Sequence, residues 1–266
     1  RTQPGARRHR YGDQHMSAPA LAGRRAFVTG GSRGIGRAIA RRLVAEGCAV
    51  TITGRDPASV ASAAAALGCT GIAADVADVQ AMEAGFAAAG AVDILVNNAG
   101  IALSKPFLAH EIAEWNAVLA INLTGAFLGC RLALPGMIAR RWGRIITIAS
   151  TAGHKGYAYT AAYRASKHGV IGLTRALAIE TARSGVTVNA ICPGFTDTDL
   201  TTAAAAVIEA KTGRSAEAAR AALTALNPQN RLIAPDEIAE AAAFLCRPEA
   251  LGVTGQSLII AGGEVM

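Results

Sequence analysis

The sequence predicts one α/β domain, a doubly wound and mainly parallel sheet with helices on both faces. Two observations predict this class: short apolar runs alternate with longer Ala-rich segments from about residue 25, and the apolar runs show no polar alternation. Strands that alternate with helices build βαβ units, and strands covered on both faces are apolar throughout. A length of 266 residues allows one large domain or two small ones. Because no Pro-, Ser- or Gly-rich linker follows Met16, we expect one domain over residues 23–266.

We expect seven strands, over residues 25–29, 49–53, 70–73, 92–96, 144–149, 186–191 and 257–260. The longest helices are expected over 111–140, with a kink near Pro135, and over 159–183. Residues 196–233 contain Ala-rich helical stretches but no expected strand. Long excursions at the carboxyl end of a parallel sheet often cover a ligand, so we expect this segment to cover the substrate. A purely structural helical insertion is the alternative.

The net charge of +7 does not indicate a nucleic-acid partner. Residues 1–16 carry four arginines against Asp13, so +3 of the +7 lies in this short segment, and the other charges are scattered. No stretch reaches about 18 uninterrupted apolar residues, so we expect no membrane-spanning helix. The five cysteines form no Cys-x-x-Cys pair and have no histidine at metal-ligand spacing. We therefore expect reduced thiols, no metal site and a cytoplasmic location.

Residues 1–22 are expected to form a disordered tail. This segment begins with Arg, lacks an apolar core of signal-peptide length and reaches Met16 just before the globular pattern begins. Met16 is the expected natural start, and a targeting segment is the weaker alternative.

A glycine-rich turn, Thr29-Gly-Gly-Ser-Arg-Gly-Ile-Gly36, lies between the first expected strand and the first helix. Glycines let the backbone turn tightly and approach a pyrophosphate, whose charge meets the free N–H groups of a helix N-terminus. The strand–turn–helix context favours a dinucleotide site, although the glycine spacing differs from the usual G-x-G-x-x-G. The expected contacts are Gly30, Ser32, Arg33, Gly34, Ile35 and Gly36.

The end of the second strand bears on the choice of cofactor. A carboxylate there would bind the 2′-hydroxyl of NAD and repel a 2′-phosphate, but the sequence has Gly54 at that point. Arg33 and Arg55 could instead clamp a phosphate by charge-assisted hydrogen bonds. We therefore expect NADP(H), with NAD(H) as the alternative. The alternative is that both arginines are ordinary solvent-exposed side chains. The negative charge of Asp56 argues against a bound phosphate.

Tyr163 and Lys167 lie four residues apart in an expected helix, and so on one face of it. A tyrosine hydroxyl has an ordinary pKa of about 10, and a nearby ammonium lowers that pKa toward the range needed for proton exchange. Ser150 lies 13 residues earlier, at the end of the fifth strand, where ligands bind in such sheets. A Tyr-x-x-x-Lys pair alone is common by chance, and a surface pair is the alternative.

Together these motifs resemble the short-chain dehydrogenase/reductase family. They occur in the family order: Thr29-Gly-x-x-x-Gly-x-Gly36, Asp75-Val76, Asn97-Asn-Ala-Gly100, Asn122, Ser150, Tyr163-x-x-x-Lys167 and Pro193-Gly194. The match covers roughly Gly23 to the C-terminus and implies a Rossmann-like fold and NAD(P)-dependent oxidoreductase activity. One departure is Ala261 before Gly262-Gly263, where many relatives carry Asp; it lies outside the catalytic set.

The resemblance implies a role for each matched residue. Tyr163 would be the general acid in carbonyl reduction and the base in alcohol oxidation, and Lys167 would lower its pKa and hold the nicotinamide ribose. Ser150 would bind the substrate oxygen, and Asn122 would hold a water of the proton relay. The remaining cofactor contacts would be Asp75 and Val76 at the adenine, Asn98, Ala99 and Gly100 at its ribose, and Pro193, Gly194, Thr196 and Thr198 beside the nicotinamide.

Within the family, residues 162–175 and 192–198 are similar to β-ketoacyl thioester and polyketide ketoreductases. Residues 227–231 and 262–266 are similar to 3-hydroxyacyl-CoA dehydrogenase-like members. We therefore expect reduction of a 3-oxoacyl thioester, and the apolar residues and four cations of 196–233 would suit an acyl chain on CoA or acyl carrier protein. A solvated amphipathic helix pair is the alternative for that segment.

The alternative enzymatic function is reduction of another ketone, a polyketide or a sugar-like alcohol. A dinucleotide-binding sensor or scaffold is the non-enzymatic alternative. Such a protein would have no need of Asn, Ser, Tyr and Lys together at catalytic spacing. Family members are commonly tetramers through their two long helices, so a homotetramer or a dimer is expected.

Overall fold

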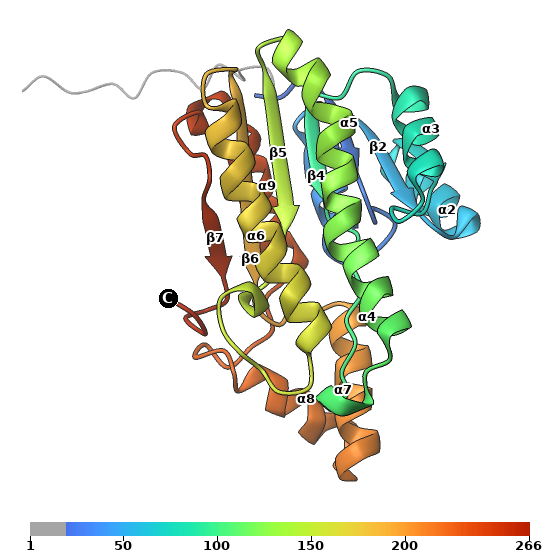
Figure 1. Ribbon diagram of the computed structural model, residues 1–266, viewed down its shortest axis with the longest axis vertical. Helices are drawn as coiled ribbons and strands as arrows, with labels where there is room; N and C mark the ends of the chain where they lie inside the picture. The colour runs from blue at the N-terminus through green and yellow to red at the C-terminus, as the bar shows by residue number, and fades with distance from the viewer. Residues whose placement is uncertain (1–19) are drawn as a thin grey trace, which may run out of the picture.

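The computed structural model describes residues 20–266 and contains one seven-stranded sheet (Figure 1). Neighbouring strands are all parallel, in the order β3-β2-β1-β4-β5-β6-β7. The order reverses between β1 and β4, and ligands bind at such a switch point, outside the carboxyl ends of the strands. The strands are β1 (Arg25–Val28), β2 (Ala49–Gly54), β3 (Thr70–Ala73), β4 (Ile94–Asn97), β5 (Gly143–Ile148), β6 (Val186–Pro193) and β7 (Ser257–Ile260).

Helices cover both faces of this sheet, which confirms the predicted doubly wound architecture. The α-helices are α1 (Gly34–Ala45), α2 (Pro57–Leu67), α3 (Val79–Ala89), α4 (Ile112–Leu119), α5 (Gly125–Ala139), α6 (Ala161–Thr181), α7 (Asp199–Thr212), α8 (Ala216–Thr224) and α9 (Pro235–Cys246). Short helical turns lie at Phe107–Ala109, Thr151–Gly153 and Pro248–Ala250.

Two apolar cores hold the layers together, one on each face of the sheet. On one face, buried residues of α1, α2 and α9 pack on the strands, among them Ile39, Val60 and Leu245. On the other face, buried residues of α3, α5 and α6 do the same, and the rings of Phe27 and Phe86 stack at 4.2 Å. The central strands β4, β5 and β6 are buried along their whole length, as expected when helices cover both faces of a parallel sheet.

The domain begins earlier than the sequence indicated. Leu21, which we placed in the tail, is only 1% exposed and belongs to the core that contains α1. Its carbonyl oxygen accepts a hydrogen bond from the Cys48 thiol at 3.6 Å. An apolar residue at the edge of a tail is not distinguishable by sequence from a core residue. The expectations for Met16 and the preceding residues lie outside the described residues.

The long helix expected over 111–140 has a change of geometry inside it. Helices α4 and α5 are joined by a π-helical turn, Ala120–Thr124, and Pro135 lies within α5. By length and composition alone, the stretch Ile112–Ala139 could cross a membrane, with a mean hydropathy of 1.7. However, 44% of its apolar window is buried, and Met137 lies in the core against the sheet. The side of this stretch that faces the sheet is therefore apolar because it packs in the core.

Residues 196–233 leave the sheet after β6 and form α7 and α8 at the carboxyl ends of the strands (Figure 1). We call this segment the lid. Its two ends lie side by side, because Thr196 and Ile233 form a parallel bridge and the Asp197 N–H donates to the Ile233 oxygen at 2.9 Å. The lid therefore begins and ends at the same place in the fold.

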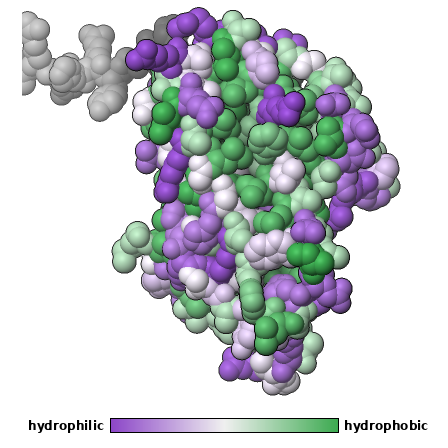
Figure 2. All heavy atoms as spheres, viewed as in Figure 1, coloured by the Kyte–Doolittle hydropathy of each residue, from purple (hydrophilic) through white to green (hydrophobic). Residues whose placement is uncertain are grey.

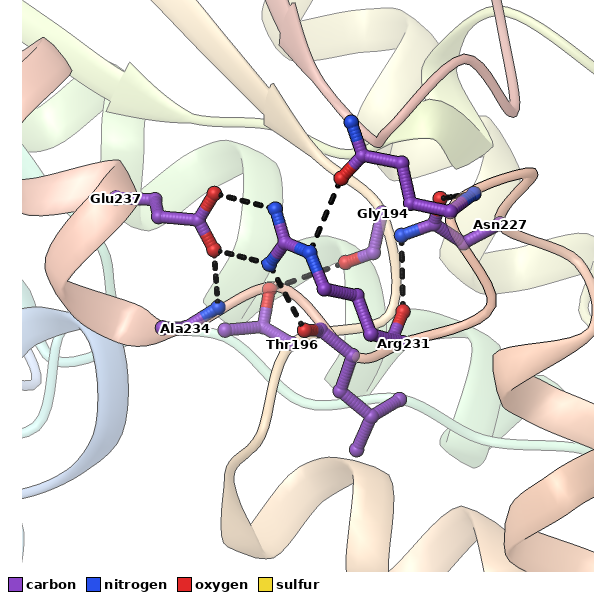
Figure 3. Close-up of polar contacts among 8 residues, drawn as sticks. Gly194, Thr196, Asn227, Arg231, Ala234 and Glu237 are labelled. Carbon is purple, nitrogen blue, oxygen red and sulfur yellow. Dashed lines mark hydrogen bonds and ion pairs between the residues drawn. The ribbon is translucent and has the colours of Figure 1, made fainter.

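Polar contacts of Arg231 and Asn227 secure the returning end of the lid (Figure 3). The Arg231 guanidinium donates to both carboxylate oxygens of Glu237 at the start of α9, at 2.5 and 2.8 Å. The buried Asn227 amide donates to the Arg231 carbonyl at 2.8 Å. A Cβ on Gly262 would come within 2.0 Å of Asn227 Oδ1, so the turn after β7 packs closely against the Asn227 side chain.

Candidate active site

The glycine-rich turn between β1 and α1 has the shape of an anion cradle. Gly30 and Gly34 have φ angles of 64° and 52°, which favour glycine. A Cβ on Gly36 would come within 2.3 Å of both the Asn98 amide nitrogen and the Gly30 oxygen. Arg33, the N-cap of α1, makes no side-chain cap hydrogen bond. The first N–H groups of α1 can therefore bind a phosphate, and the turn fits a dinucleotide pyrophosphate.

Asn98 braces this turn from the end of β4. Its amide nitrogen donates to the carbonyl oxygens of Thr29 at 2.9 Å and Gly30 at 3.0 Å. The Thr29 hydroxyl in return accepts the N–H groups of Asn98 at 3.0 Å and Ala99 at 3.1 Å. The family resemblance implied that Asn98 lies at a ribose, and it implied no separate role for Thr29. The structure shows that both shape the cradle.

The end of β2 carries no carboxylate that could face a ribose. Gly54 occupies that point, and a Cβ there would lie 3.4 Å from the Ser32 hydroxyl in the glycine-rich turn. Asp56, which we set against a phosphate, instead accepts the Ser59 N–H at 3.0 Å and caps α2. The Asp56 carboxylate therefore has a local structural role, which weakens that objection.

Two arginines flank the same corner of the molecule. Arg55 is exposed, and an Arg33 guanidinium nitrogen lies 3.6 Å from an oxygen of Asp199 at the start of α7, both side chains being largely exposed. An exposed pair at this distance contributes little stability, roughly 0–1 kcal/mol. Arg33 can therefore exchange Asp199 for a bound phosphate at little cost.

Asp75 and Val76 follow β3 at the carboxyl edge of the sheet. An Asp75 carboxylate oxygen accepts the Ala77 N–H at 3.0 Å, which stabilises the turn before α3. Val76 is buried, and a Cβ on Gly125 would lie 3.0 Å from its side chain. Gly125 thus lets the start of α5 approach the turn after β3.

Ser150 and Tyr163 come from two elements that meet at the carboxyl end of β5. Ser150 follows that strand, and its hydroxyl oxygen accepts the Ala152 N–H at 3.1 Å. Tyr163 lies near the start of α6. Burial raises the pKa of the Tyr163 hydroxyl, while the Ser150 hydroxyl and the Arg164 guanidinium act in the opposite direction. Tyr163 is therefore protonated at neutral pH, as a general acid must be.

Lys167 lies one helical turn after Tyr163 and is buried. Its ammonium group donates to the Ile148 carbonyl oxygen at 2.7 Å and lies 5.6 Å from the centre of the Tyr163 ring. Burial lowers the pKa of Lys167 to about 8. The pair predicted from a four-residue spacing does share one helix face, and the charge on Lys167 is lost as the pH rises through about 8.

Asn122 lies in the π-helical turn between α4 and α5. Its side chain exchanges two 2.9 Å hydrogen bonds with the backbone of Ile101 and donates to the Ser166 hydroxyl at 3.1 Å. It thereby ties the loop after β4 to α6. A cavity of about 10 Å³ beside it has room for about one water molecule. Polar residues lining this cavity are Thr29, Asn97, Asn122 and Thr147.

The chain turns away from the sheet after Pro193, the last residue of β6. The Gly194 N–H donates to the Ile260 oxygen of β7 at 2.9 Å, and the Thr196 hydroxyl donates to the Gly194 oxygen at 3.1 Å (Figure 3). A Cβ on Gly34 would lie 3.3 Å from the Thr198 methyl group. The start of the lid therefore touches the phosphate cradle.

The glycine-rich turn and the Ser150, Tyr163 and Lys167 side chains lie within the part of the chain that matches a known family. The short chain dehydrogenase family model matches residues 24–208. The chain belongs to the short-chain dehydrogenase/reductase family. The predicted family is confirmed, and the protein is an NAD(P)-dependent oxidoreductase.

Similar members of the family match this chain along nearly its whole length. A 3-oxoacyl-(acyl-carrier-protein) reductase of Vibrio harveyi is 41% identical over 252 residues, which are 92% of this chain and 99% of the relative. D-beta-hydroxybutyrate dehydrogenase of Cupriavidus necator is 40% identical over 257 residues, with coverage of 92% and 99%. Among solved structures, a variant of actinorhodin polyketide ketoreductase with NADPH has a TM-score of 0.89 and 39% identity, covering 93% of this chain and 98% of that one.

Two side chains of this dehydrogenase lie beside the site without belonging to a family motif. The Tyr157 hydroxyl is 3.2 Å from the Thr151 hydroxyl, next to Ser150. Glu264 is almost fully buried and pairs with Lys155 at 3.1 Å. The contact of Glu264 joins distant parts of the chain, and the contacts of Tyr157 depend on how the irregular loop after Ser150 folds, so neither shows as a sequence pattern. The only sequence signal is an acidic residue directly after Gly262-Gly263.

The described part of the chain shows neither a metal-binding cluster nor a disulfide. Between residues 20 and 266, no cluster of three or more His, Cys, Asp or Glu side chains could hold a metal ion. All five cysteines are free thiols. Burial raises the pKa of Cys192, the cysteine beside Lys167, to about 11, so it is a neutral thiol at physiological pH.

Proposed function

We propose that this dehydrogenase reduces 3-oxoacyl thioesters, carried on coenzyme A or acyl carrier protein, to 3-hydroxyacyl thioesters with NADPH. The observation that carries the proposal is the meeting of Ser150, Tyr163 and Lys167 at the carboxyl end of β5. The substrate class is supported by full-length relatives named as a 3-oxoacyl reductase and a β-hydroxybutyrate dehydrogenase.

Each of these side chains has a defined task in carbonyl reduction. NADPH supplies the hydride when bound. Tyr163 donates a proton to the carbonyl oxygen, and the Ser150 hydroxyl binds the same oxygen and stabilises the charge that develops there. Lys167, protonated below about pH 8, attracts the phenolate that remains on Tyr163. Asn122 holds the loop and the small cavity from which a water can return the proton.

Residues at the switch point of the sheet would hold the cofactor. The turn from Gly30 to Gly36, including Ser32 and Ile35, would cradle the pyrophosphate, and Arg33 and Arg55 would hold the 2′-phosphate. The remaining contacts are Asp75, Val76, Asn98, Ala99, Gly100, Tyr163, Lys167, Pro193, Gly194, Thr196 and Thr198. Preference for NADPH over NADH is supported by the glycine at residue 54 and by the use of Asp56 as a helix cap.

Changing Arg55 to aspartate tests the choice of cofactor. We expect Arg55→Asp to weaken NADPH binding about tenfold or more, because a charge-assisted hydrogen bond is replaced by like-charge repulsion. NADH binding should stay within about twofold. Fluorescence titration of both cofactors measures this, with Arg183→Asp, an exposed arginine just after α6, as the control. Unchanged NADPH affinity would show that Arg55 does not contact the phosphate.

The pH dependence follows from Lys167. Burial lowers the pKa of Lys167 to about 8. Above that pH the side chain is an uncharged amine, which no longer stabilises the Tyr163 phenolate. We expect kcat/KM for ketone reduction to fall as the pH rises through about 8, and Lys167→Met to be uniformly slow. Initial rates between pH 6 and pH 10 measure this. A wild-type profile that stays flat over that range would contradict the assignment.

The lid covers the acyl group and its carrier. Of its four cations, Arg220 pairs with Asp197 at 2.9 Å and Arg231 pairs with Glu237. The bidentate pair of Arg231 with Glu237 holds the returning end of the lid, so we do not assign Arg231 to a phosphate. Lys211 and Arg214 form no ion pair within residues 20–266. They are the cations of the lid that we assign to the phosphates of the carrier.

The protein forms a cytoplasmic homotetramer or dimer through α5 and α6. Phe127 and Ile138 of α5 and Ile179 of α6 are large apolar residues exposed on one chain. Figure 2 shows apolar surface on the face that these helices form. Pairing of this face between copies of the chain would bury it. Sedimentation at several concentrations tests this, and a monomer at micromolar concentration would contradict it.

The substrate class is tested by following NADPH oxidation at 340 nm. We expect acetoacetyl-CoA to be reduced with a kcat/KM at least about tenfold above that of ethyl acetoacetate, cyclohexanone or a keto sugar. The difference reports the binding energy of the carrier. A ketone without a thioester that is reduced faster than acetoacetyl-CoA would overturn the proposed substrate and leave the oxidoreductase chemistry intact.

A further inference from the structure

Tyr157 lies where separate segments of the active site meet. Its hydroxyl is 3.2 Å from the hydroxyl of Thr151, which follows Ser150. The guanidinium carbon of Arg164 lies 3.7 Å from the centre of the Tyr157 ring. The ring of Phe195 packs edge-on against it, with 6.5 Å between centroids. One side chain thus contacts the neighbours of Ser150, Tyr163 and Gly194.

Arg164 is bound to this loop as well as stacked on the ring. Its Nε donates to the Tyr157 carbonyl oxygen at 3.2 Å and to the Thr160 hydroxyl at 2.9 Å, and a terminal nitrogen donates to the Ala152 oxygen at 3.4 Å. No carboxylate in the described part of the chain forms an ion pair with it. Carbonyl oxygens and the aromatic ring therefore compensate the Arg164 charge.

Lys155 links Tyr157 to the C-terminal turn. Its ammonium lies 4.8 Å from the centre of the Tyr157 ring and 3.1 Å from a carboxylate oxygen of Glu264. The Glu264 side chain is 1% exposed, and a Cβ on Gly194 would lie 2.9 Å from its other oxygen. The loop that contains Tyr157 is therefore fixed both to the turn after β6 and to the end of the chain.

We propose that Tyr157 is a positioning residue that sets the separation of the Ser150 and Tyr163 hydroxyls. It joins Thr151 and Arg164, which are the direct chain neighbours of those two residues. The inference rests on the function proposed above, in which both hydroxyls bind one carbonyl oxygen. Each must reach that oxygen at hydrogen-bond distance, about 2.6–3.2 Å. A displacement of about 1 Å between them lowers the rate as much as about a hundredfold.

Three tyrosine variants of one loop test the proposal. Tyr157→Phe removes only the bond to Thr151 and is expected to lower kcat about fivefold, the size of a lost neutral hydrogen bond. Tyr157→Ala also removes the ring beneath Arg164 and is expected to lower kcat about a hundredfold. The NADPH dissociation constant should stay within about twofold of wild type in both. Tyr159→Phe is the matched control, because Tyr159 is 62% exposed, and should leave kcat unchanged.

A double-mutant cycle with Thr151→Val separates positioning from general destabilisation. If the two hydroxyls act through their mutual bond, Thr151→Val and Tyr157→Phe together should lower kcat no further than either alone. Additive losses would overturn the role of that bond. A Tyr157→Ala protein with kcat within twofold of wild type would overturn the proposal. So would a loss that appears equally in NADPH binding and in the melting temperature.

The assays use whichever carbonyl compound the wild type reduces fastest. If the protein does not reduce thioesters, the proposed substrate is wrong, but the tyrosine variants still test the role of Tyr157. Amide hydrogen exchange gives a readout that needs no substrate. Tyr157→Ala, unlike Tyr159→Phe, should speed exchange at Gly153 and Arg164, whose N–H groups bond to Ser150 and Thr160. Unchanged exchange at both amides would contradict the positioning role.

Discussion

Replacing Tyr163 with phenylalanine is expected to lower kcat for carbonyl reduction by about a thousandfold. The variant keeps the ring and its packing but loses the hydroxyl that donates the proton, and general acid catalysis contributes about 10²–10⁴ in rate. NADPH should still bind within about threefold of the wild-type affinity, because Tyr163 is one of many proposed cofactor contacts and the glycine-rich turn lies elsewhere, between β1 and α1. Stopped-flow and steady-state measurements with one ketone give both quantities.

The matched control for this change is Tyr159→Phe, which removes a hydroxyl from an exposed tyrosine four residues earlier. It should react at the wild-type rate. If Tyr163→Phe also reacted at more than about a tenth of the wild-type rate, Tyr163 could not be the acid. Residual activity with an altered pH dependence would point instead to a water acting through Ser150.

Placing a methyl group on Gly36 is expected to weaken NADPH binding about a hundredfold. The new Cβ would lie 2.3 Å from both the Asn98 amide nitrogen and the Gly30 oxygen, so the turn or α1 must shift. Overpacking of this kind costs about 1–3 kcal/mol, and each 1.4 kcal/mol is about a tenfold change in a binding constant. Calorimetric titration of the Gly36→Ala protein with NADPH measures the loss.

Gly172 provides the matched control, since it lies in α6 with nothing within 4 Å of an added Cβ. Gly172→Ala should bind NADPH like wild type and unfold at a slightly higher temperature, because alanine favours helix over glycine. NADPH affinity of Gly36→Ala within about threefold of wild type would show that the cradle tolerates the shift. The turn would then not be shaped for a pyrophosphate.

The fold was predictable from the sequence because its main signal is local. The run Ile94-Leu-Val96 in β4, for example, is apolar without alternation, and helices on both faces of the sheet require that pattern. The boundary at Leu21 was not predictable, since one apolar residue beside a tail becomes core only through contacts made elsewhere. The π-helical turn at Ala120–Thr124 likewise has no composition of its own.

The candidate site, like the fold, was only partly predictable from the sequence. The spacing of Tyr163 and Lys167 on one helix is a local property, and the structure places both on one face. The lid was recognisable as an interruption of the alternation of strands and helices, but the ion pairs of Arg220 with Asp197 and of Arg231 with Glu237 were not predictable from the sequence. Glu264 was missed because its partner Lys155 is distant in sequence, and Tyr157 was missed because its contacts depend on the path of an irregular loop.

The most direct test of the central claim is to find where the hydride of NADPH goes. Acetoacetyl-CoA is incubated with wild-type protein and NADPH deuterated on the transferred position, and the product is analysed by mass spectrometry. We expect 3-hydroxybutyryl-CoA with one deuterium at C3, formed in proportion to the NADPH consumed. NADPH oxidation without deuterium at that carbon would contradict the account.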